Sequence, residues 1–403
     1  GSGSHGSGSH GSGSQTTRPS GPTYALRSSV PTTGTANVAS TASISLTFTK
    51  PVALHKVTPV LTPHVAGYWV QSTPTTLSFD LAAPLVPGVQ EQVTVPGGTS
   101  GLLGSTGEEL ARPTTVTFDI APGDMLRVQQ LLAELDYLPL SFTPAGPPPS
   151  PSELAVDQEG SFAWRWADQP SELMSLWIQG QENEIVKAAI ESFENQNGIG
   201  VDGIAGPAVW TSLINDTIDH KVNATPYVYV LVNKVEPENL TLWNNGTAQY
   251  VGIPVNTGAP GADTTDGSFA VFEHVRYSDM KGTNPDGTTY NDPNVPYASY
   301  FNGGDALHGF IRSSYGTPQS NGCVEMTYAD ASLVYPLTPI GTLVTVEGPN
   351  YGTAPPSTTT TSTSSTTTTT APAAAATTTT APPVPPATTP PAPTGGTGTG
   401  GTP

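Results

Sequence analysis

The spacing of apolar residues changes twice along the chain, and this constrains the fold more than any other feature. Up to residue 121, apolar and polar residues alternate in short runs that Pro and Gly separate. Alternation with period two predicts half-buried strands. Residues 23–121 are therefore predicted to form an all-β sandwich. The clearest of these runs are Ala42–Phe48, Val86–Val95 and Val116–Ile120.

The apolar period becomes helical over residues 124–135, where Asp124 is placed to cap the first turn. A second apolar stripe predicts a helix over 182–196. The pair Gly206-Pro207 is typical of the start of a third helix, because Pro suits the first helical position. Residues 122–220 are thus predicted to form a small three-helix domain.

This helical region contains a Pro-rich insertion, residues 141–178, with three tryptophans, Trp164, Trp166 and Trp177. We expect these rings to form the insertion's own hydrophobic core. The helix order and the turn Asp202–Pro207 together resemble a small peptidoglycan-binding domain, and the preceding sandwich resembles a bacterial immunoglobulin-like domain. The insertion departs from the simplest form of the first family, so glycan binding is left open.

Composition excludes several classes of protein. The chain has 13 Lys and Arg against 32 Asp and Glu, a net charge of −19, which would repel nucleic acid phosphates. No stretch of about 20 apolar residues occurs, so no membrane span is predicted. Residues 1–14 repeat Gly, Ser and His like an expression tag, and the Thr-, Pro- and Ala-rich residues 349–403 are predicted to be a disordered tail.

The last folded region, residues 222–348, is predicted to be mainly β. The runs 228–232 and 240–243 are rich in strand-forming residues, and Asn245-Gly246 predicts a hairpin turn after the second run. Further strand-like runs cover 268–275 and 341–346, with little helical periodicity between them.

The only cysteine of the chain, Cys323, cannot form an intramolecular disulfide, so its presence needs another explanation. A thiol attacks a carbonyl as thiolate, and His308 is the nearest imidazole in sequence that can take its proton. The carbonyl of Gly309 is expected to orient the ring. The backbone at Gly322 and Cys323, together with Asn321, is the predicted oxyanion hole.

Four segments in this order resemble the L,D-transpeptidase catalytic domain, the YkuD fold, over residues 222–348. They are Val255–Gly258 with Asp266–Phe269, Tyr300–Gly304, His308-Gly309 and Ser320–Cys323.

The resemblance implies a cysteine acyl transfer from a tetrapeptide stem of peptidoglycan, with release of D-alanine. The acceptor it implies is a diaminopimelate amine, which gives a 3-3 cross-link. It further implies that carbapenems acylate Cys323, that no cofactor or metal takes part, and that the protein is secreted, extracytoplasmic and wall-associated. Tyr300, Ser320 and Glu325 are the predicted substrate-binding residues.

Two positions depart from the family pattern: Asn321 stands where many members have a second histidine, and Glu325 where Arg or Asn is commoner. An amide cannot carry the charge of an imidazolium, so thiolate stabilisation is expected to depend more on His308. The other histidines lack clustered ligand spacing, so no metal site is predicted.

Other functions are compatible with parts of this pattern. With water as acceptor the enzyme would be a carboxypeptidase. Other cysteine acyl-transfer families fit less well, because NlpC-type peptidases place cysteine before histidine, and sortases need an arginine after the cysteine, whereas no Lys or Arg follows Arg312. From a different class, a wall-binding or adhesive protein with a decayed catalytic domain remains the alternative.

Overall fold

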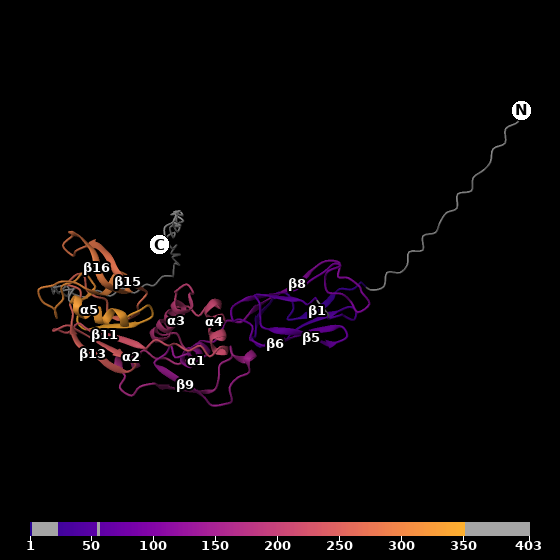
Figure 1. Ribbon diagram of the computed structural model, residues 1–403, viewed down its shortest axis with the longest axis horizontal. Coiled ribbons are helices and arrows are strands. Elements are labelled where there is room, and N and C mark those ends of the chain that lie inside the picture. The colour runs from indigo at the N-terminus through magenta and orange to yellow at the C-terminus, as the bar shows by residue number, and fades with distance from the viewer. Residues whose placement is uncertain (2–22, 55–56, 351–403) are drawn as a thin grey trace, which may run out of the picture. The chain divides into compact units, whose positions relative to one another are not determined.

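The protein is described by a computed structural model that covers Gly1, residues 23–54 and residues 57–350 (Figure 1). The expected tag apart from Gly1, and the expected tail beyond residue 350, lie outside the described residues. The fold is multidomain and mostly β with few helices, which confirms the predicted fold class.

The N-terminal region is a sandwich of two four-stranded sheets, drawn in indigo and purple in Figure 1. Apolar side chains from both sheets, among them Leu46, Leu77, Val93 and Phe118, form its core. The first sheet runs in the order β1 (Leu26–Val30), β3 (Ile44–Phe48), β6 (Thr76–Leu81), β5 (Gly67–Thr73). The second runs in the order β2 (Thr35–Val38), β8 (Thr114–Ile120), β7 (Gln90–Val95), β4 (Val60–Thr62).

A carboxyl group is buried in this sandwich. The alternation of β7 turns Glu91, Val93 and Val95 inward, and Glu91 is 1% exposed. Burial raises the pKa of Glu91 to about 7, and its Oε1 has no hydrogen-bond partner within the described residues. The protonated form is therefore the one that the folded sandwich favours.

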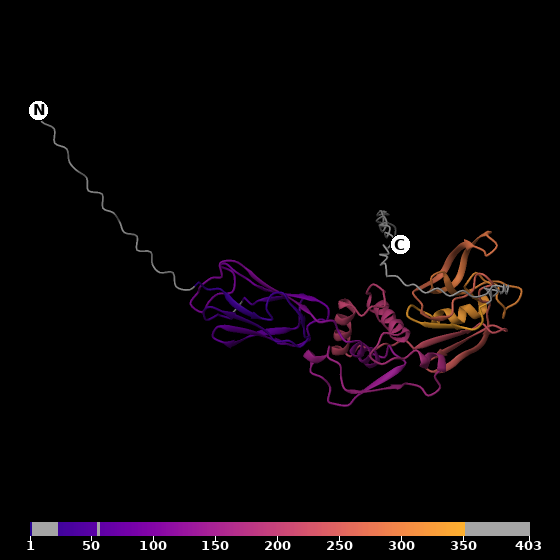
Figure 2. The same ribbon diagram turned by 180° about the vertical axis from the view of Figure 1, so that it is seen from behind.

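The helical region contains the three predicted helices and a short fourth one (Figure 2). Asp124 caps the first helix through its side chain, which accepts a hydrogen bond from Leu126 N at 2.8 Å. Asn183 caps α3 in the same way, so that helix begins two residues later than predicted. The helices are α1 (Met125–Glu134), α2 (Ser171–Ser175), α3 (Glu184–Asn197) and α4 (Pro207–Ile218).

The insertion folds as a hairpin, β9 (Leu140–Pro144) with β10 (Gly160–Trp164), and a 3-10 turn at Pro151–Glu153. Trp164 and Trp177 pack against the core of the helices, so the prediction of a separate core for the insertion was wrong. The insertion shares a core because its hairpin lies directly against α1 and buries apolar surface there.

Polar side chains of α1 fasten the insertion. Arg127 is fully buried, and its Nε donates to Leu154 O at 2.9 Å. Gln129 Nε2 donates to the carbonyls of Ile178 and Gln181, both at 2.9 Å. These side chains satisfy backbone groups of a loop that has few partners of its own, which is how a polar face of a helix becomes interior.

The C-terminal region has two sheets around one core, with a short helix, α5 (Tyr328–Val334), and a 3-10 turn, Tyr335–Leu337. The five-stranded sheet has the order β13 (Thr247–Pro254), β12 (Asn239–Asn244), β11 (Val228–Asn233), β19 (Leu343–Glu347), β14 (Gly267–Ala270). The four-stranded sheet has the order β15 (Glu273–Thr283), β16 (Thr289–Asn302), β17 (Asp305–Gly309), β18 (Val324–Met326).

Strand β11 is buried on both faces. Val228, Val230 and Val232 face the core of the C-terminal region, whereas Tyr229 and Leu231 pack with the helices. A strand covered on both sides has no polar alternation, which accounts for the continuous apolar run in the sequence. The five-stranded sheet therefore belongs to two cores at once.

Two details of this region differ from the sequence predictions. The run 268–275 is not one strand, because the chain leaves β14 at Ala270 and enters the other sheet with β15 at Glu273. Between them, Val271 N donates to Thr342 O and Phe272 N donates to Tyr300 O, so the chain passes from one sheet to the other. Helix α5 was not predicted, since its seven residues are too few to show a clear period.

Candidate active site

Strand β17 carries the predicted histidine, and the predicted cysteine directly precedes the neighbouring strand β18. The two strands are parallel, with Leu307 opposite Val324 and His308 opposite Glu325. Opposite residues in a sheet face the same side, and alternate residues share a face. Leu307 and Val324 face the core, so His308 and Glu325 lie on the other face. Cys323 lies one residue before β18, and its Sγ is 3.5 Å from the carbonyl oxygen of Gly304, the residue before β17.

The imidazole of His308 is buried and held in one orientation. The side chain is 2% exposed, and its Nδ1 lies 3.1 Å from the carbonyl oxygen of Gly309. A carbonyl only accepts, so Nδ1 carries a proton and Nε2 is the nitrogen left to act as a base. Burial lowers the pKa of His308, which keeps the ring neutral near pH 7.

Cys323 is half-buried among polar backbone groups. Its Sγ lies 3.5 Å from Gly304 O, to which the thiol donates. Burial raises the pKa of the Cys323 thiol to about 12, and the charges of Asp305 and Glu325 act in the same direction. The resting pair is thus a thiol and a neutral imidazole, which suits proton transfer to the base during attack.

The turn before the cysteine is closed by Ser320. Its hydroxyl donates to Cys323 O at 2.5 Å and accepts from Gly322 N at 3.2 Å. Because this bond occupies the N–H of Gly322, Cys323 supplies the candidate oxyanion donor of the two predicted amides. Ser320 itself is 2% exposed, which places it in the support of the turn.

Only glycine fits at position 322. Its φ is +111°, and a Cβ there would lie 2.3 Å from Asp305 Oδ1. Both the backbone conformation and the neighbouring carboxylate therefore require glycine. Asp305 is not among the residues predicted from the sequence, although it is an acidic residue at the start of the apolar run before His308.

The side chain of Asn321 does not join the turn. It is exposed, and its Nδ2 donates to Asn284 Oδ1 at 2.7 Å, between the ends of β15 and β16. Tyr300 stands opposite Ala306 in the sheet and shares a hydrogen bond of 2.7 Å between its Oη and Ser278 Oγ. Burial raises the pKa of Tyr300, whereas the hydrogen bond with Ser278 lowers it.

Glu325 forms an ion pair with Arg312 rather than facing open solvent. Arg312 Nε and Nη2 each lie 2.7 Å from one carboxylate oxygen of Glu325, which is 4% exposed. The guanidinium also donates to Gln319 O. The acidic departure from the family pattern is therefore compensated by a cation 13 residues earlier in the chain.

The segment Val255–Gly258 packs against the loop between His308 and Cys323. Buried Glu238 accepts from both the N–H and the hydroxyl of Thr257, each at 2.7 Å. Asn256 accepts from Gly316 N at 3.0 Å and donates to Ser314 O at 3.1 Å. These contacts hold the loop that connects the histidine and the cysteine.

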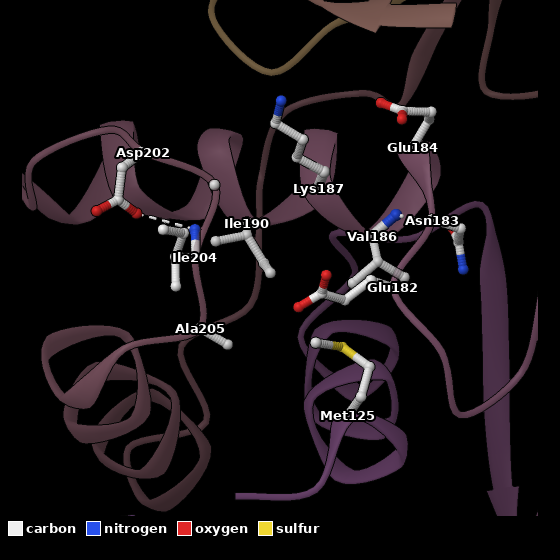
Figure 3. Close-up of a pocket in the computed structure, with 11 residues that line it drawn as sticks. Met125, Glu182, Asn183, Glu184, Val186, Lys187, Ile190, Asp202, Ile204 and Ala205 are labelled. Atoms are coloured by element: carbon white, nitrogen blue, oxygen red, sulfur yellow. Dashed lines mark hydrogen bonds between the residues drawn. The ribbon is translucent and has the colours of Figure 1, made fainter. Parts of the chain in front are cut away.

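A pocket of about 400 Å³ lies in the helical region (Figure 3). Met125 of α1 and Val186 and Ile190 of α3 line it together with carboxylates of Glu182, Glu184 and Asp202, and Lys187. None of residues 141–178 lines it, so the insertion leaves this pocket open. Asp202 Oδ1 accepts from Ile204 N at 2.9 Å, which fixes the turn at its edge.

Two general features of the described residues bear on the class of protein. No helix in the described part is long and apolar enough to cross a membrane. Within the same residues, no group of three or more His, Cys, Asp or Glu side chains is arranged to hold a metal ion.

Comparisons with known proteins agree with this division of the chain. Residues 227–346 match the family model of the L,D-transpeptidase catalytic domain, YkuD. Residues 21–120 match that of the bacterial Ig-like domain. No curated protein matches the chain.

Solved structures of L,D-transpeptidases are similar at low identity. An enzyme from Mycobacterium smegmatis is 10% identical over 81% of this chain and 100% of its own, with a TM-score of 0.28. L,D-transpeptidase 3 from Mycobacterium tuberculosis is 13% identical over 80% of this chain and 99% of its own, also with a TM-score of 0.28.

The catalytic domain of the E. faecium enzyme acylated by ertapenem is 24% identical over 31% of this chain and 100% of its own, with a TM-score of 0.26. The two family matches identify the chain as one that combines a bacterial Ig-like domain with an L,D-transpeptidase catalytic domain of the YkuD family.

Proposed function

We propose that residues 222–348 catalyse acyl transfer on peptidoglycan stem peptides with Cys323 as nucleophile and His308 as base. The observation that carries this proposal is that Cys323 Sγ lies 3.5 Å from Gly304 O, directly before the strand that carries His308, whose Nδ1 is 3.1 Å from Gly309 O. The Gly309 contact leaves Nε2 as the basic nitrogen of the ring.

In the acylation step, the thiol proton passes to Nε2 while the sulfur attacks the carbonyl before the terminal D-alanine. The oxygen of the tetrahedral intermediate becomes negative and accepts a hydrogen bond from Cys323 N. The C–N bond then breaks, and the imidazolium gives its proton to the departing amine of D-alanine. The products are a thioester, free D-alanine and a neutral histidine.

In the second step, an amine attacks the thioester, and His308 takes a proton from the attacking nitrogen and returns it to the leaving thiolate. A diaminopimelate amine as acceptor gives a 3-3 cross-link. Water as acceptor gives an L,D-carboxypeptidase, and the partition between the two acceptors decides which activity dominates.

The setting that fits this chemistry is the cell wall. We propose a secreted, extracytoplasmic protein whose partners are stem peptides, with glycan strands as candidates for the pocket of the helical region. The resemblance of residues 122–220 to a small peptidoglycan-binding domain is what suggests glycan strands for this pocket. Carbapenems are expected to acylate the enzyme because their strained amide offers the thiol an equivalent carbonyl.

A mass measurement tests the proposal. The purified protein is incubated with a carbapenem and weighed, and because Cys323 is the only cysteine, a thioester adduct has one possible position. An adduct on the wild type that Cys323→Ala lacks and His308→Gln forms much more slowly supports the enzyme. A folded wild-type protein without an adduct favours the alternative, a wall-binding protein with a decayed catalytic domain.

A second measurement distinguishes the acceptors. Disaccharide-tetrapeptide is supplied as both donor and acceptor, and the products are separated by mass. Cross-linked dimers identify the transpeptidase, whereas tripeptides alone identify the carboxypeptidase.

A further inference from the structure

The carboxylate of Asp305 lies close to the backbone around the proposed nucleophile. Asp305 lies between Gly304, whose carbonyl accepts from Cys323 Sγ at 3.5 Å, and Ala306. Its Oδ1 abuts Gly322, the residue before Cys323, so closely that a Cβ there would lie 2.3 Å away. None of the predicted site residues supplies a charge in this position.

The Asp305 carboxylate has polar neighbours but no cation. Asn302 Nδ2 donates to its Oδ2 at 3.4 Å. Among the ion pairs within the described residues, none includes Asp305. The side chain is half-buried, and burial raises its pKa to about 6, so it is mostly ionised at neutral pH.

An unpaired negative charge in this place opposes the first half of the proposed reaction. Both the thiolate and the oxyanion are negative, and a carboxylate beside them makes each less stable. A cation bound next to Asp305 removes that penalty. The second half of the reaction brings such a cation, because an amine acceptor is an ammonium ion before it attacks.

The turn that precedes Asp305 borders open space. Gly303 and Gly304 are exposed, and a Cβ added at either would meet no atom within 4 Å. The two glycines thus border open space beside Asp305, next to the carbonyl that touches the sulfur. A primary amine can approach the thioester along this side.

We propose that Asp305 binds the ammonium group of the acceptor and takes one of its protons before attack, which makes it an acceptor-binding residue of the site. The inference rests on the proposed acyl transfer. The neutral amine then forms the new C–N bond as the C–S bond breaks, and its second proton passes through His308 to the thiolate. The proton on Asp305 is released to solvent, so the charges balance over one turnover.

The two half-reactions test this role separately. Carbapenem acylation involves no acceptor, whereas the ratio of cross-linked dimer to hydrolysed tripeptide reports how well an amine competes with water. Asp305→Asn keeps the shape of the side chain and removes its charge. We expect this variant to acylate faster than wild type and its dimer-to-tripeptide ratio to fall at least 10-fold, about the loss of one charged contact.

Controls separate the possible causes. Glu236→Gln removes an exposed carboxylate elsewhere in the same domain and is expected to keep the wild-type acylation rate and dimer-to-tripeptide ratio. Asp305→Glu is expected to recover part of the ratio, and an acceptor whose amine is acetylated is expected to give no dimer with any variant. Circular dichroism and the adduct itself show that each variant is folded.

The outcomes are distinguishable. If Asp305→Asn acylates normally and keeps the wild-type ratio, the acceptor-binding role is wrong and the proposed function stands. If both half-reactions fall equally, Asp305 has only a structural role, and this inference is again wrong. If the wild type forms no adduct at all, the proposed function itself fails.

Discussion

Arg312 and Glu325 form a two-pronged ion pair, with both N···O distances at 2.7 Å, and Glu325 is the strand neighbour of His308. The charge of Glu325 raises the pKa of His308 and that of Cys323, whereas the charge of Arg312 lowers the pKa of His308. The guanidinium of Arg312 therefore offsets the negative charge of the buried Glu325 carboxylate next to the reacting groups.

Removal of Arg312 alone is expected to lower stability and the acylation rate more than removal of both charges. Arg312→Ala leaves the Glu325 carboxylate buried without a partner, and we expect it to cost about 2–3 kcal/mol of stability. This is less than the ~3–5 kcal/mol typical of a fully buried pair, because the Arg312 side chain is 31% exposed. Carbapenem acylation should slow as well, since the thiol is harder to ionise.

The double variant Arg312→Ala with Glu325→Gln is the control. It removes both charges and should recover stability and acylation rate relative to Arg312→Ala alone, as measured by urea unfolding and stopped-flow acylation. Equal losses in the single and double variants would show that the carboxylate is not the cause.

The pH dependence of acylation follows from the neutral resting pair. The pKa of His308 lies below its ordinary value of 6.5, so the basic form persists at lower pH than in a free imidazole. We expect the acylation rate to rise through a midpoint below pH 6.5 and then to stay level through pH 8. Rates of carbapenem acylation from pH 4.5 to 9 check this.

The thiol itself can be followed by its absorbance near 240 nm. With a pKa of about 12, Cys323 should show no thiolate band at pH 7, whereas the Cys323→Ala spectrum serves as the baseline. A strong thiolate band at neutral pH would mean that the resting pair is an ion pair, contrary to this expectation.

Gly322→Ala should disable the turn before the nucleophile. A non-glycine residue at φ +111° is strained, and the new Cβ would meet Asp305 Oδ1 at 2.3 Å. The Cys323 N–H would then shift from the oxyanion, and we expect acylation to fall by about 100-fold. Acylation kinetics measure the loss, and an unchanged melting temperature shows that the rest of the domain is intact.

Combining Gly322→Ala with Asp305→Gly relieves the contact but not the backbone strain. The double variant is compared with Asp305→Gly alone, which already lacks the opposing charge. It should acylate more slowly than Asp305→Gly, and equal rates would mean that the conformation of Gly322 is unimportant.

Glu91 makes the N-terminal sandwich more stable in mild acid. Its folded pKa is about 7 against 4.5 in the unfolded chain, so the folded form binds the proton more tightly. The resulting stability is present below pH 4.5 and is lost as the pH rises through 7, and it amounts to about 3 kcal/mol at most. Glu91→Gln should remove this loss.

Urea unfolding of the full chain at pH 4.5 and pH 8 provides the comparison. The variant and the wild type should be similar at the lower pH, with the variant more stable at the higher one. Burial also raises the pKa of Glu191 to about 7. Glu191 is present in both the wild type and the variant, so its contribution cancels in the difference between them. If both proteins lose stability equally, Glu91 is not responsible.

Local signals in the sequence were sufficient for several elements. The Asp124 cap fixed the start of α1, and Asn245-Gly246 lies in a turn with both residues at positive φ. The place of Glu325 beside His308 was not visible in the sequence, because it depends on the parallel register of β17 and β18. Motif resemblance pointed to His308 and Cys323, whereas the contact of Cys323 with Gly304 depends on the folded chain.

Other features depend on contacts between distant segments. From the sequence, Arg127 and Gln129 are expected on the solvent-exposed face of a helix. They are buried because the insertion folds over them. Glu91 sits among polar neighbours in the sequence but faces inward. Such residues follow the tertiary structure, which overrides the local pattern.

In strand β11, Tyr229 packs in the core with the helices and Val230 packs in the other core, so the five-stranded sheet separates two hydrophobic cores. A fragment cut at residue 222 would expose Tyr229, Leu343 and Ala270 to water, and such a fragment should aggregate. We therefore expect the helices and the C-terminal sheets to fold together, as one cooperative unit in urea unfolding.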